Sequence, residues 1–580
     1  MEYTSKEVYE YISKQTNDPI VERKTCTVSG ALFPIYKSDL QFYEKVWPVL
    51  QWVKYPIATP KLCPEERRRR RMGWRNENVF YRRTCNSTWK QVLSTFSENN
   101  PHKVYDWKIW YSDQRDPLKY WIDMDYSKHF FQVFQTLNLS VPKPSLLMAE
   151  SMENCDYCSY GQYSKSCYLS TGATYSENCY YSSFPIRCIN DIDWFLNVSC
   201  QNCYQCICCH NCYETFFCDY TQYCKNSYYL SFCNDCECCI GCTNLNHKKY
   251  CILNKQYSKE KYENVLKHMQ EDSAFRNKII EEFNQLRLES PRKHLEEYMV
   301  ENNFSNSVQN GKDNILCFNV VESNGNKYSY FEWWNEDPSY DSYSGFWAYC
   351  LESCWTKWIN SAFIAHSKPA YDCFYSIYLI NCRHCFWCVG LRNKEYCILN
   401  KQYTPDTYEQ EVIKIIKHMQ STWERWEFFP LSDSLFGYNE SVAQTFLPLT
   451  EDKAKSLNYR WQDNESVANI PQGLNVIPAE NLPDYIDEDY NNIVRKAFLC
   501  SKTHKPYRFI EQEFKFYKKY KLPLPKYHHD ERKKMLLGKG MWDVFDLTTC
   551  DKCKKEILYV RHPREQRKIY CKDCYSKYFW

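Results

Sequence analysis

The sequence predicts a mainly β protein: a duplicated, narrow β-solenoid with a three-residue period and a helical insert, flanked by two related, small zinc-ribbon-like α+β modules. Three observations lead to this prediction: cysteines that recur at every third residue, an internal repeat in the middle of the chain, and a second repeat that relates its two ends. At 580 residues the chain is longer than one ordinary domain, so several structural units are expected.

The three-residue period is clearest between Cys155 and Cys251, where 17 of 19 cysteines share one frame and only Cys208 and Cys238 fall outside it. An α-helix turns by about 300° in three residues and so loses this phase. On a flat strand, residues three apart face opposite sides. A solenoid of short sides and corners keeps the phase, with cysteines inside and tyrosines outside or between sides. The coil length stays open, because the cysteines fit steps of twelve and of eighteen residues.

The aligned cysteines have three interpretations. The favoured one is a narrow core filled by a small, soft side chain. Disulfides are possible because neighbouring coils lie within bridging distance, although a chain without an export signal is expected in a reducing compartment. Metal binding or redox chemistry is the third, since the runs Cys200 to Cys206 and Cys233 to Cys242 are rich in thiols.

The internal repeat defines the two halves of the solenoid. CTNLNHKKYCILNKQY (242–257) recurs as CVGLRNKEYCILNKQY (388–403), with eleven of sixteen residues identical. The predicted order is a Cys-rich half at 151–257, a helical insert at 258–305, the second half at 306–403, a helix at 404–428 and a polar connector at 429–499.

The second repeat relates the predicted end modules, 1–145 and 500–580. The order Cys26, SDLQFYEK, PKLCPEER matches Cys500, EFKFYKKY, PKYHHDER. The C-terminal copy is basic, with 21 Lys and Arg against 10 Asp and Glu.

The pattern Cys550-x2-Cys553-x17-Cys571-x2-Cys574 is the strongest chemical signal, since two such knuckles suit a closed, structural Zn²⁺ site. The N-terminal copy keeps Cys85 but has Thr88, Asp106 and Ile109 at the other three places. A further ligand set is possible at the C-terminal end. It consists of Cys500, His504 and His528. The matching pair Cys26 and Cys63 is too incomplete to be expected to hold a metal.

The order of these segments, with NKQY after CVGLRNKEYC and LCPEERRRRRMGWRNE before the triplets, resembles an uncharacterised Cys- and Tyr-rich family of small-genome, candidate-phyla bacteria. Zinc-ribbon modules flank the triplet region in that family. The resemblance implies a bacterial, cytoplasmic protein with zinc-binding ends, and it implies no activity, substrate or catalytic residue.

RNA or DNA is the favoured partner, because basic side chains interleaved with aromatics neutralise phosphates and stack on bases. The candidate contacts are Arg67, Arg68, Arg69, Arg70, Arg71, Arg75, Arg532, Lys533 and Lys534. The alternative is a protein- or glycan-binding scaffold that uses the tyrosine-rich faces of the solenoid. A catalytic role is not expected, because the chain carries none of the common nucleotide-binding, zinc-protease or hydrolase motifs. No apolar run is long enough for a membrane span, so no membrane contact is expected.

Overall fold

The computed structural model describes residues 3–148, 151–334, 337–346, 349–424, 426–463, 474–483, 490–493, 495–540, 543–562 and 566–579. The chain is mixed, with 28% helix and 29% strand, and its long sheets are parallel or mixed. The expected mainly β character is therefore too narrow, because helices of the ends and of the insert contribute as much as the sheets. None of the described helices is long and apolar enough to cross a bilayer.

Two stacks of short coils form the centre of the molecule. The first stack, 152–256, and the second stack, 297–402, are each held by parallel pairing of successive coils. In the first stack the partners are twelve residues apart, as in Ile192 with Tyr204, which decides between the two coil lengths. In the second stack the step varies: Cys350 pairs with Ser361, eleven residues on. The sequence period is therefore clear only in the first stack.

The longer paired segments are assigned as strands. Those of the first stack are β9 (Tyr213–Phe216), β10 (Lys225–Ser231), β11 (Ile240–Thr243), β12 (Cys251–Ile252) and β13 (Lys255–Gln256). Those of the second are β15 (Glu297–Tyr298), β16 (Phe304–Gln309), β17 (Ile315–Val321), β18 (Tyr330–Trp333), β19 (Tyr340–Phe346), β20 (Cys350–Ile359), β21 (Ser361–Tyr371), β22 (Cys382–Phe386), β23 (Glu395–Ile398) and β24 (Lys401–Gln402).

Each triplet has a fixed division of roles. The first residue points inward and is usually small, with Trp194 and Leu230 as exceptions. The second pairs with the next coil, and the third has positive φ and turns the corner, as Tyr181 does at 55°. Among the described residues 154–253 with positive φ, none is Val, Ile or Thr, because β-branched side chains tolerate this backbone region least. Cys208 and Cys238, the two cysteines outside the frame, occupy such corners.

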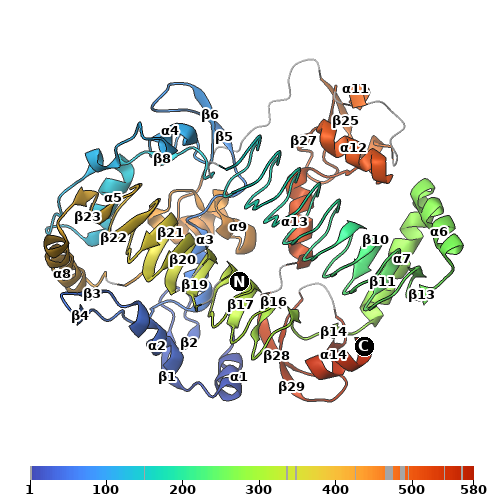
Figure 1. Cartoon of the computed structure of the whole chain (residues 1–580), viewed down its shortest axis with the longest axis horizontal. Helices are drawn as coiled ribbons and strands as arrows, with labels where there is room; N and C mark the ends of the chain where they lie inside the picture. The colour runs from blue at the N-terminus through green and yellow to red at the C-terminus, as the bar shows by residue number, and fades with distance from the viewer. Residues whose placement is uncertain are drawn as a thin grey trace.

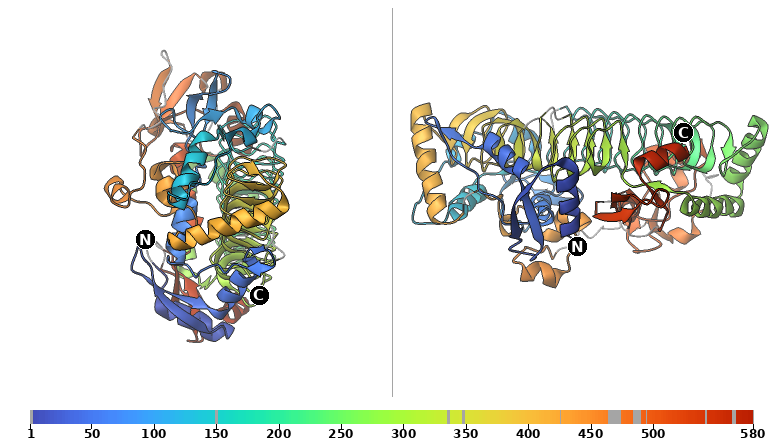
Figure 2. Two further views of the ribbon diagram at one scale, coloured as in Figure 1. Left: turned by 90° about the vertical axis from the view of Figure 1, so that its left-hand side faces the viewer. Right: turned by 90° about the horizontal axis from the view of Figure 1, so that it is seen from below.

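The two stacks lie side by side and run in opposite directions (Figure 1). Phe184 stacks on Phe331 at 4.9 Å between ring centroids, and Tyr160 lies 5.8 Å from His366. Helices α6 (Lys259–Glu271) and α7 (Ser273–Glu289) cover the outer end of the first stack, and α8 (Pro405–Ser421) covers that of the second (Figure 2). These caps protect coil edges that would otherwise pair with another chain.

Each end segment contacts the half of the repeat that is farther away in sequence, and the N-terminal segment also contacts the nearer half, as in the pair Phe80 and Tyr157. The N-terminal segment contacts the second stack: α3 packs on β19 and β20. The C-terminal segment contacts the first: Tyr204 packs on Tyr517 of α12 (Glu511–Tyr520). The N-terminal elements are α1 (Lys6–Thr16), β1 (Ile20–Thr25), β2 (Leu32–Tyr36), α2 (Lys37–Val46), β3 (Val49–Leu50), β4 (Val53–Lys54), α3 (Pro64–Met72), β5 (Tyr81–Thr84), β6 (Gln91–Ser94), β7 (Val104–Tyr105), α4 (Trp107–Tyr111), η1 (Pro117–Tyr120), α5 (Phe130–Ser140) and β8 (Lys143–Pro144).

The segment after α8 is partly packed into the core rather than being only a polar connector: Phe428, Phe436 and Val442 are buried. Its elements are η2 (Leu431–Asp433), η3 (Tyr438–Glu440), α9 (Val442–Phe446), α10 (Glu451–Ser456), β25 (Asn475–Pro478), η4 (Ala479–Asn481), α11 (Tyr490–Ile493) and β26 (Lys496–Leu499). The C-terminal elements are β27 (Pro506–Tyr507), α12 (Glu511–Tyr520), α13 (His529–Gly540), β28 (Phe545–Thr549), β29 (Glu556–Val560), β30 (Ile569–Tyr570), which pairs with β14 (Arg292–Lys293), and α14 (Lys572–Phe579).

Candidate metal centre

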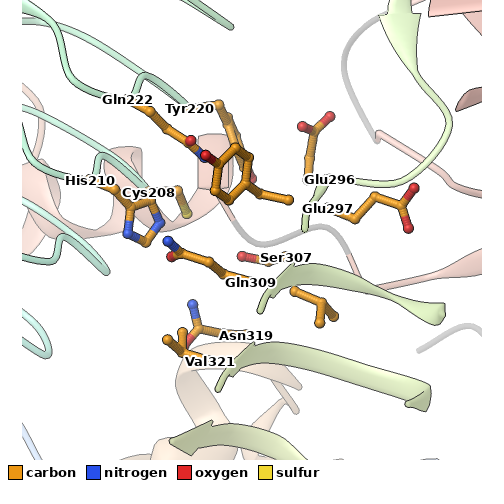
Figure 3. Close-up of a pocket in the computed structure, with 12 residues that line it drawn as sticks. Cys208, His210, Tyr220, Gln222, Glu296, Glu297, Ser307, Gln309, Asn319 and Val321 are labelled. Atoms are coloured by element: carbon orange, nitrogen blue, oxygen red, sulfur yellow. The ribbon is translucent and has the colours of Figure 1, made fainter. Parts of the chain in front are cut away.

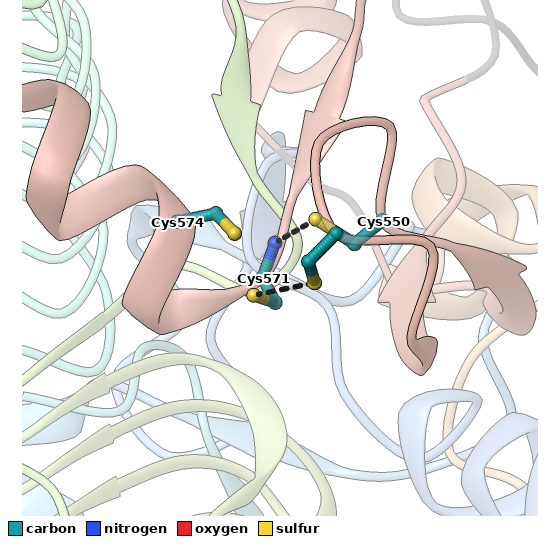
Figure 4. Close-up of side chains that lie close together, drawn as sticks. Cys550, Cys571 and Cys574 are labelled. Atoms are coloured by element: carbon teal, nitrogen blue, oxygen red, sulfur yellow. Dashed lines mark hydrogen bonds between the residues drawn. The ribbon is translucent and has the colours of Figure 1, made fainter.

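The four predicted zinc ligands come from two places in the C-terminal segment. Cys550 and Cys553 lie in the turn between β28 and β29, where Lys554 has a φ of 62° and its N–H donates to the carbonyl of Cys550. Cys571 and Cys574 lie at the start of α14, directly after β30. The hairpin turn and the helix start thus bring the two pairs together (Figure 4).

The four sulfurs all lie within 4.8 Å of one another, and those of Cys553 and Cys571 are 3.8 Å apart. Four thiolates bound to one tetrahedral metal ion at about 2.3 Å would be separated by about 3.8 Å. Cys550 and Cys571 are buried, Cys574 is half-buried and Cys553 is exposed. This group could hold a metal ion, and with four protein ligands such a site would leave no position for a substrate.

Backbone N–H groups favour a thiolate at the centre of this group. The N–H of Cys571 donates to Cys550 Sγ at 3.3 Å. Burial acts to raise the pKa of Cys550, but N–H donors from Cys553, Cys571 and Lys552 lower this pKa to about 6. A metal ligand must be deprotonated, so this arrangement suits metal binding.

The matching N-terminal hairpin, β5–β6, keeps the same turn without the ligands. Cys85 Sγ accepts hydrogen bonds from the N–H of Thr88 at 3.4 Å and of Asp106 at 3.1 Å. Thr88 therefore stands where Cys553 does and Asp106 where Cys571 does, and Ile109 is the third residue of α4 as Cys574 is of α14.

The same turn occurs at Cys26 and at Cys500. In each, the residue four positions on has positive φ and donates its N–H to the carbonyl of the cysteine; this residue is Gly30 in one turn and His504 in the other. His504 is thus a turn residue, one position beyond the place where the second ligand of a knuckle would stand.

Serine or threonine hydroxyls occupy that ligand position in these two turns. Ser29 lies near both Cys26 and Cys63, at 3.7 Å from the sulfur of Cys63. Burial acts to raise the pKa of Cys500, but hydrogen bonds from Thr503 and backbone N–H groups lower it overall. The hydroxyls thus satisfy thiols whose partner ligands are missing.

The set Cys500, His504 and His528 does not form a ligand group in the part of the chain that the structure describes; His528, His529 and Asp530 do, within 4.8 Å. Sequence reasoning missed this cluster, although HHD is visible as a run. His528 Nδ1 accepts the N–H of Asp530 at 3.2 Å, so the imidazole caps α13.

The arginine run contradicts the expectation of an exposed basic surface. Every guanidinium from Arg67 to Arg71, and that of Arg75, belongs to a residue that is no more than 8% exposed. Asp341 Oδ1 accepts from Arg67 at 2.9 Å and from Arg71 at 3.1 Å, and Glu352 accepts from Arg70 at 2.7 Å. The other ion pairs are Arg68–Asp543, Arg69–Glu66 and Arg75–Glu77. The charges of these six arginines are therefore neutralised inside the described part of the protein rather than presented on its surface.

The C-terminal basic residues give the same result. Arg532 is 4% exposed and is paired with Asp193 at 2.5 Å. Lys533 is half-buried and donates to Asn78 Oδ1 at 2.5 Å. Lys534 is the exception, since its side chain is 69% exposed, although it pairs with Glu531 at 3.0 Å.

None of the 35 cysteines forms a disulfide in the structure. Inside the stacks each inward thiol donates to a nearby carbonyl, as Cys206 does to Tyr204 at 3.5 Å. No three thiols of the described coils lie close enough together to form a ligand group like that of Cys550. Comparison with protein-family models, curated proteins and solved structures gave no match.

Proposed function

We propose that the protein is a non-enzymatic interaction scaffold. In this proposal the two stacks are a duplicated β-solenoid, the C-terminal segment is a zinc ribbon held by a structural Zn²⁺, and the partner binds the tyrosine-rich side of the first stack. The resemblance to the Cys- and Tyr-rich family with flanking zinc ribbons belongs to the same proposal. A cytoplasmic location is part of it, because free thiols on this scale fit a reducing compartment.

The observation that carries this function is a row of exposed aromatic and apolar side chains on one side of the first stack. They occupy two positions of the twelve-residue coil, and one inward-facing position separates the two. Exposed fractions are 55% for Tyr163, 53% for Tyr175, 40% for Ile189, 39% for Tyr213 and 42% for Tyr223. The rings of Tyr163 and Tyr175 are stacked at 4.9 Å. Exposed tyrosines offer large contact area at low entropic cost.

The charges on this side are largely balanced. Lys165 lies 3.8 Å from Glu153, and Lys249 lies 2.6 Å from Glu237. A surface of this kind favours a neutral partner over a polyanion. The surface repeats with each coil, about every 4.8 Å. Such a regular repeat suits a polymer of repeating units, so we favour a glycan over a folded protein as the partner.

Affinity electrophoresis through gels that contain a neutral soluble glycan, hydroxyethylcellulose, tests this binding. Retardation is expected to be equal at 50 mM and at 500 mM NaCl. The added salt shortens the Debye length from about 14 Å to about 4 Å and so weakens charge-based contacts only. Y163A/Y175A should lose the retardation. W89A is the control, since it removes a side chain that is 77% exposed outside the stack. Retardation that is absent, or that survives in Y163A/Y175A, would refute the glycan-binding face.

Zinc is tested separately by metal analysis of the purified chain. About one Zn²⁺ per chain is expected, and C553S should lose it, whereas C238S, at a corner of the first stack, should not. Retention of zinc in C553S would exclude Cys553 as a ligand.

Nucleic-acid binding stays as a second candidate because of three exposed lysines around the metal centre, Lys552, Lys554 and Lys555. They could contact phosphates where the buried arginines cannot. Binding of poly(U) that weakens steeply with salt, and that K552E/K554E/K555E abolishes, would favour this candidate over the glycan.

A further inference from the structure

A cavity of about 70 Å³ lies between the two stacks (Figure 3). It is at one end of their overlap, where Tyr220 of the first stack and Ser307 of the second contribute to its wall. A single water needs about 10 to 15 Å³ on the same measure. The space is therefore large enough for a small polar molecule.

The cavity exists because the two ends of the overlap differ. At the opposite end of the overlap, Tyr160 of the first stack occupies the position that corresponds to Ser307 of the second stack. Both residues have positive φ, 60° for Tyr160 and 56° for Ser307. The guanidinium of Arg75 lies over the ring of Tyr160, 4.0 Å from its centroid, at that end of the overlap.

Matching hydrogen bonds confirm the correspondence of the two ends. His366 Nε2 donates to the carbonyl of Trp74 at 2.8 Å, and the hydroxyl of Tyr220 donates to the carbonyl of Gly540 at 2.8 Å. Ser307 leaves open the space that the tyrosine fills in the other copy.

In the part of the chain that the structure describes, two buried oxygen atoms in the wall of this cavity lack hydrogen-bond partners, and both are acceptors. Glu296 Oε1 and Gln309 Oε1 are both buried and have no hydrogen-bond partner within the described residues. By contrast, Glu297 is paired with Lys293 at 3.2 Å, and Asn319 Oδ1 accepts from an indole at 3.1 Å. A buried acceptor left unsatisfied costs about 1–3 kcal/mol, more when it is charged.

We propose that the cavity binds a small protonated amine, whose N–H groups donate to Glu296 and Gln309. An anion would lie beside the carboxylates of Glu296 and Glu297. The His, Cys, Asp and Glu side chains of the wall are not among the metal-ligand groups that the described residues form, so an organic cation is favoured over a metal ion. Burial raises the pKa of Glu296 to about 7, against the opposing effect of Lys293 and the nearby arginines. The carboxylate is therefore ionised at pH 8.

The test is isothermal titration of the full chain with methylammonium chloride at pH 8, with sodium chloride and sodium acetate as reference titrants. Saturable binding of methylammonium alone is expected. E296Q should weaken it roughly tenfold or more, because a charge-assisted hydrogen bond is lost. S307Y introduces the residue found at the corresponding position of the first stack, Tyr160. Its ring should fill the cavity and abolish binding. N310Y is the matched control, since it places a tyrosine at an exposed corner of positive φ near the cavity.

Absence of saturable methylammonium binding to the unmodified chain would overturn the proposal. Binding that persists at full strength in both E296Q and S307Y would also overturn it, as would saturable binding of acetate instead. E296Q changes no volume, so it remains informative if the larger side chain of S307Y disturbs folding.

Discussion

At most inward positions of the first stack the side chain is short, and many of these side chains both donate and accept a hydrogen bond; Trp194 and Leu230 are large exceptions. Cys218 Sγ donates to the carbonyl of Phe216 and accepts the N–H of Leu230, both at 3.4 Å. Ser176 Oγ does the same with Thr174 and Cys188. The spacing of cysteines predicted which residues face inward. It did not predict that these side chains accept a hydrogen bond, because the N–H donor lies on the next coil, twelve residues on, and the coil length was not known from the sequence. The acceptor role explains why cysteine and serine share these positions.

Substitution of Cys218 separates packing from hydrogen bonding. C218S keeps both bonds and should change the free energy of unfolding by less than about 1 kcal/mol. C218A leaves the N–H of Leu230 without an acceptor and should cost about 1–3 kcal/mol. C218V adds bulk to the same defect and should cost more. Urea unfolding measures all three, and a C218A as stable as C218S would contradict the acceptor role.

His366 gives a pH-dependent contribution that the other copy lacks. Burial lowers the pKa of His366 from 6.5 to about 3. Below pH 6.5 the unfolded chain takes up a proton that the native imidazole does not, so stability falls by up to about 1.4 kcal/mol per pH unit down to about pH 3. H366Y places the residue of the other copy, Tyr220, at this position. Melting from pH 7 to pH 4 should show a smaller loss in H366Y than in the unmodified chain, and equal losses would contradict this assignment.

Among the elements, the knuckle turn is the one that the chain repeats most faithfully. It occurs at Cys26, Cys85, Cys500 and Cys550. Only the turn at Cys550 has a second cysteine three residues after the first. The ligand group at Cys550 could be predicted because its spacing is complete. Whether Cys500, His504 and His528 bind a metal could not be predicted from the sequence. In the turn, a second ligand would stand three residues after the cysteine, and the residue with positive φ, His504, stands four residues after it. Only the backbone conformation distinguishes these two adjacent positions.

Restoring three ligands should therefore create a metal site in the N-terminal hairpin. T88C/D106C/I109C adds thiols at the places that correspond to Cys553, Cys571 and Cys574, beside a Cys85 whose N–H contacts already match. The zinc content should rise from about one to about two per chain, and Co²⁺ should give thiolate charge-transfer absorption of twice the intensity. The double variant T88C/I109C offers only three ligands and is the control. An unchanged zinc content would show that the hairpin and α4 are not placed as in the C-terminal copy.

At the scale of the whole molecule, the sequence predicted the repeats but not how they pack. The run of arginines was expected to contact nucleic-acid phosphates because it is basic and interleaved with aromatic residues. Its partners Asp341 and Glu352 lie far along the chain: Arg71 and Asp341 are 270 residues apart, and Arg70 and Glu352 are 282 residues apart. Each end segment crosses to the distant stack, and no local pattern carries that information.

Two corresponding ion pairs fix this crossed arrangement. Arg67 in PEER pairs with Asp341 of the second stack, and Arg532 in HDER pairs with Asp193 of the first. Both arginines also lie over a corner tyrosine, Tyr328 at 5.1 Å and Tyr181 at 4.8 Å.

Because all four charges are buried, removing one partner leaves the other uncompensated. D193N and D341N should each lower the free energy of unfolding by about 3–5 kcal/mol, and R532M should recover part of the loss in D193N. D235N is the control: Asp235 is also a corner of positive φ, but its pair with His247 is exposed, so less than about 1 kcal/mol is expected. If D193N and D341N unfold at the same denaturant concentration as D235N, the end segments are held by apolar packing alone and the buried pairs do not determine which stack each segment contacts.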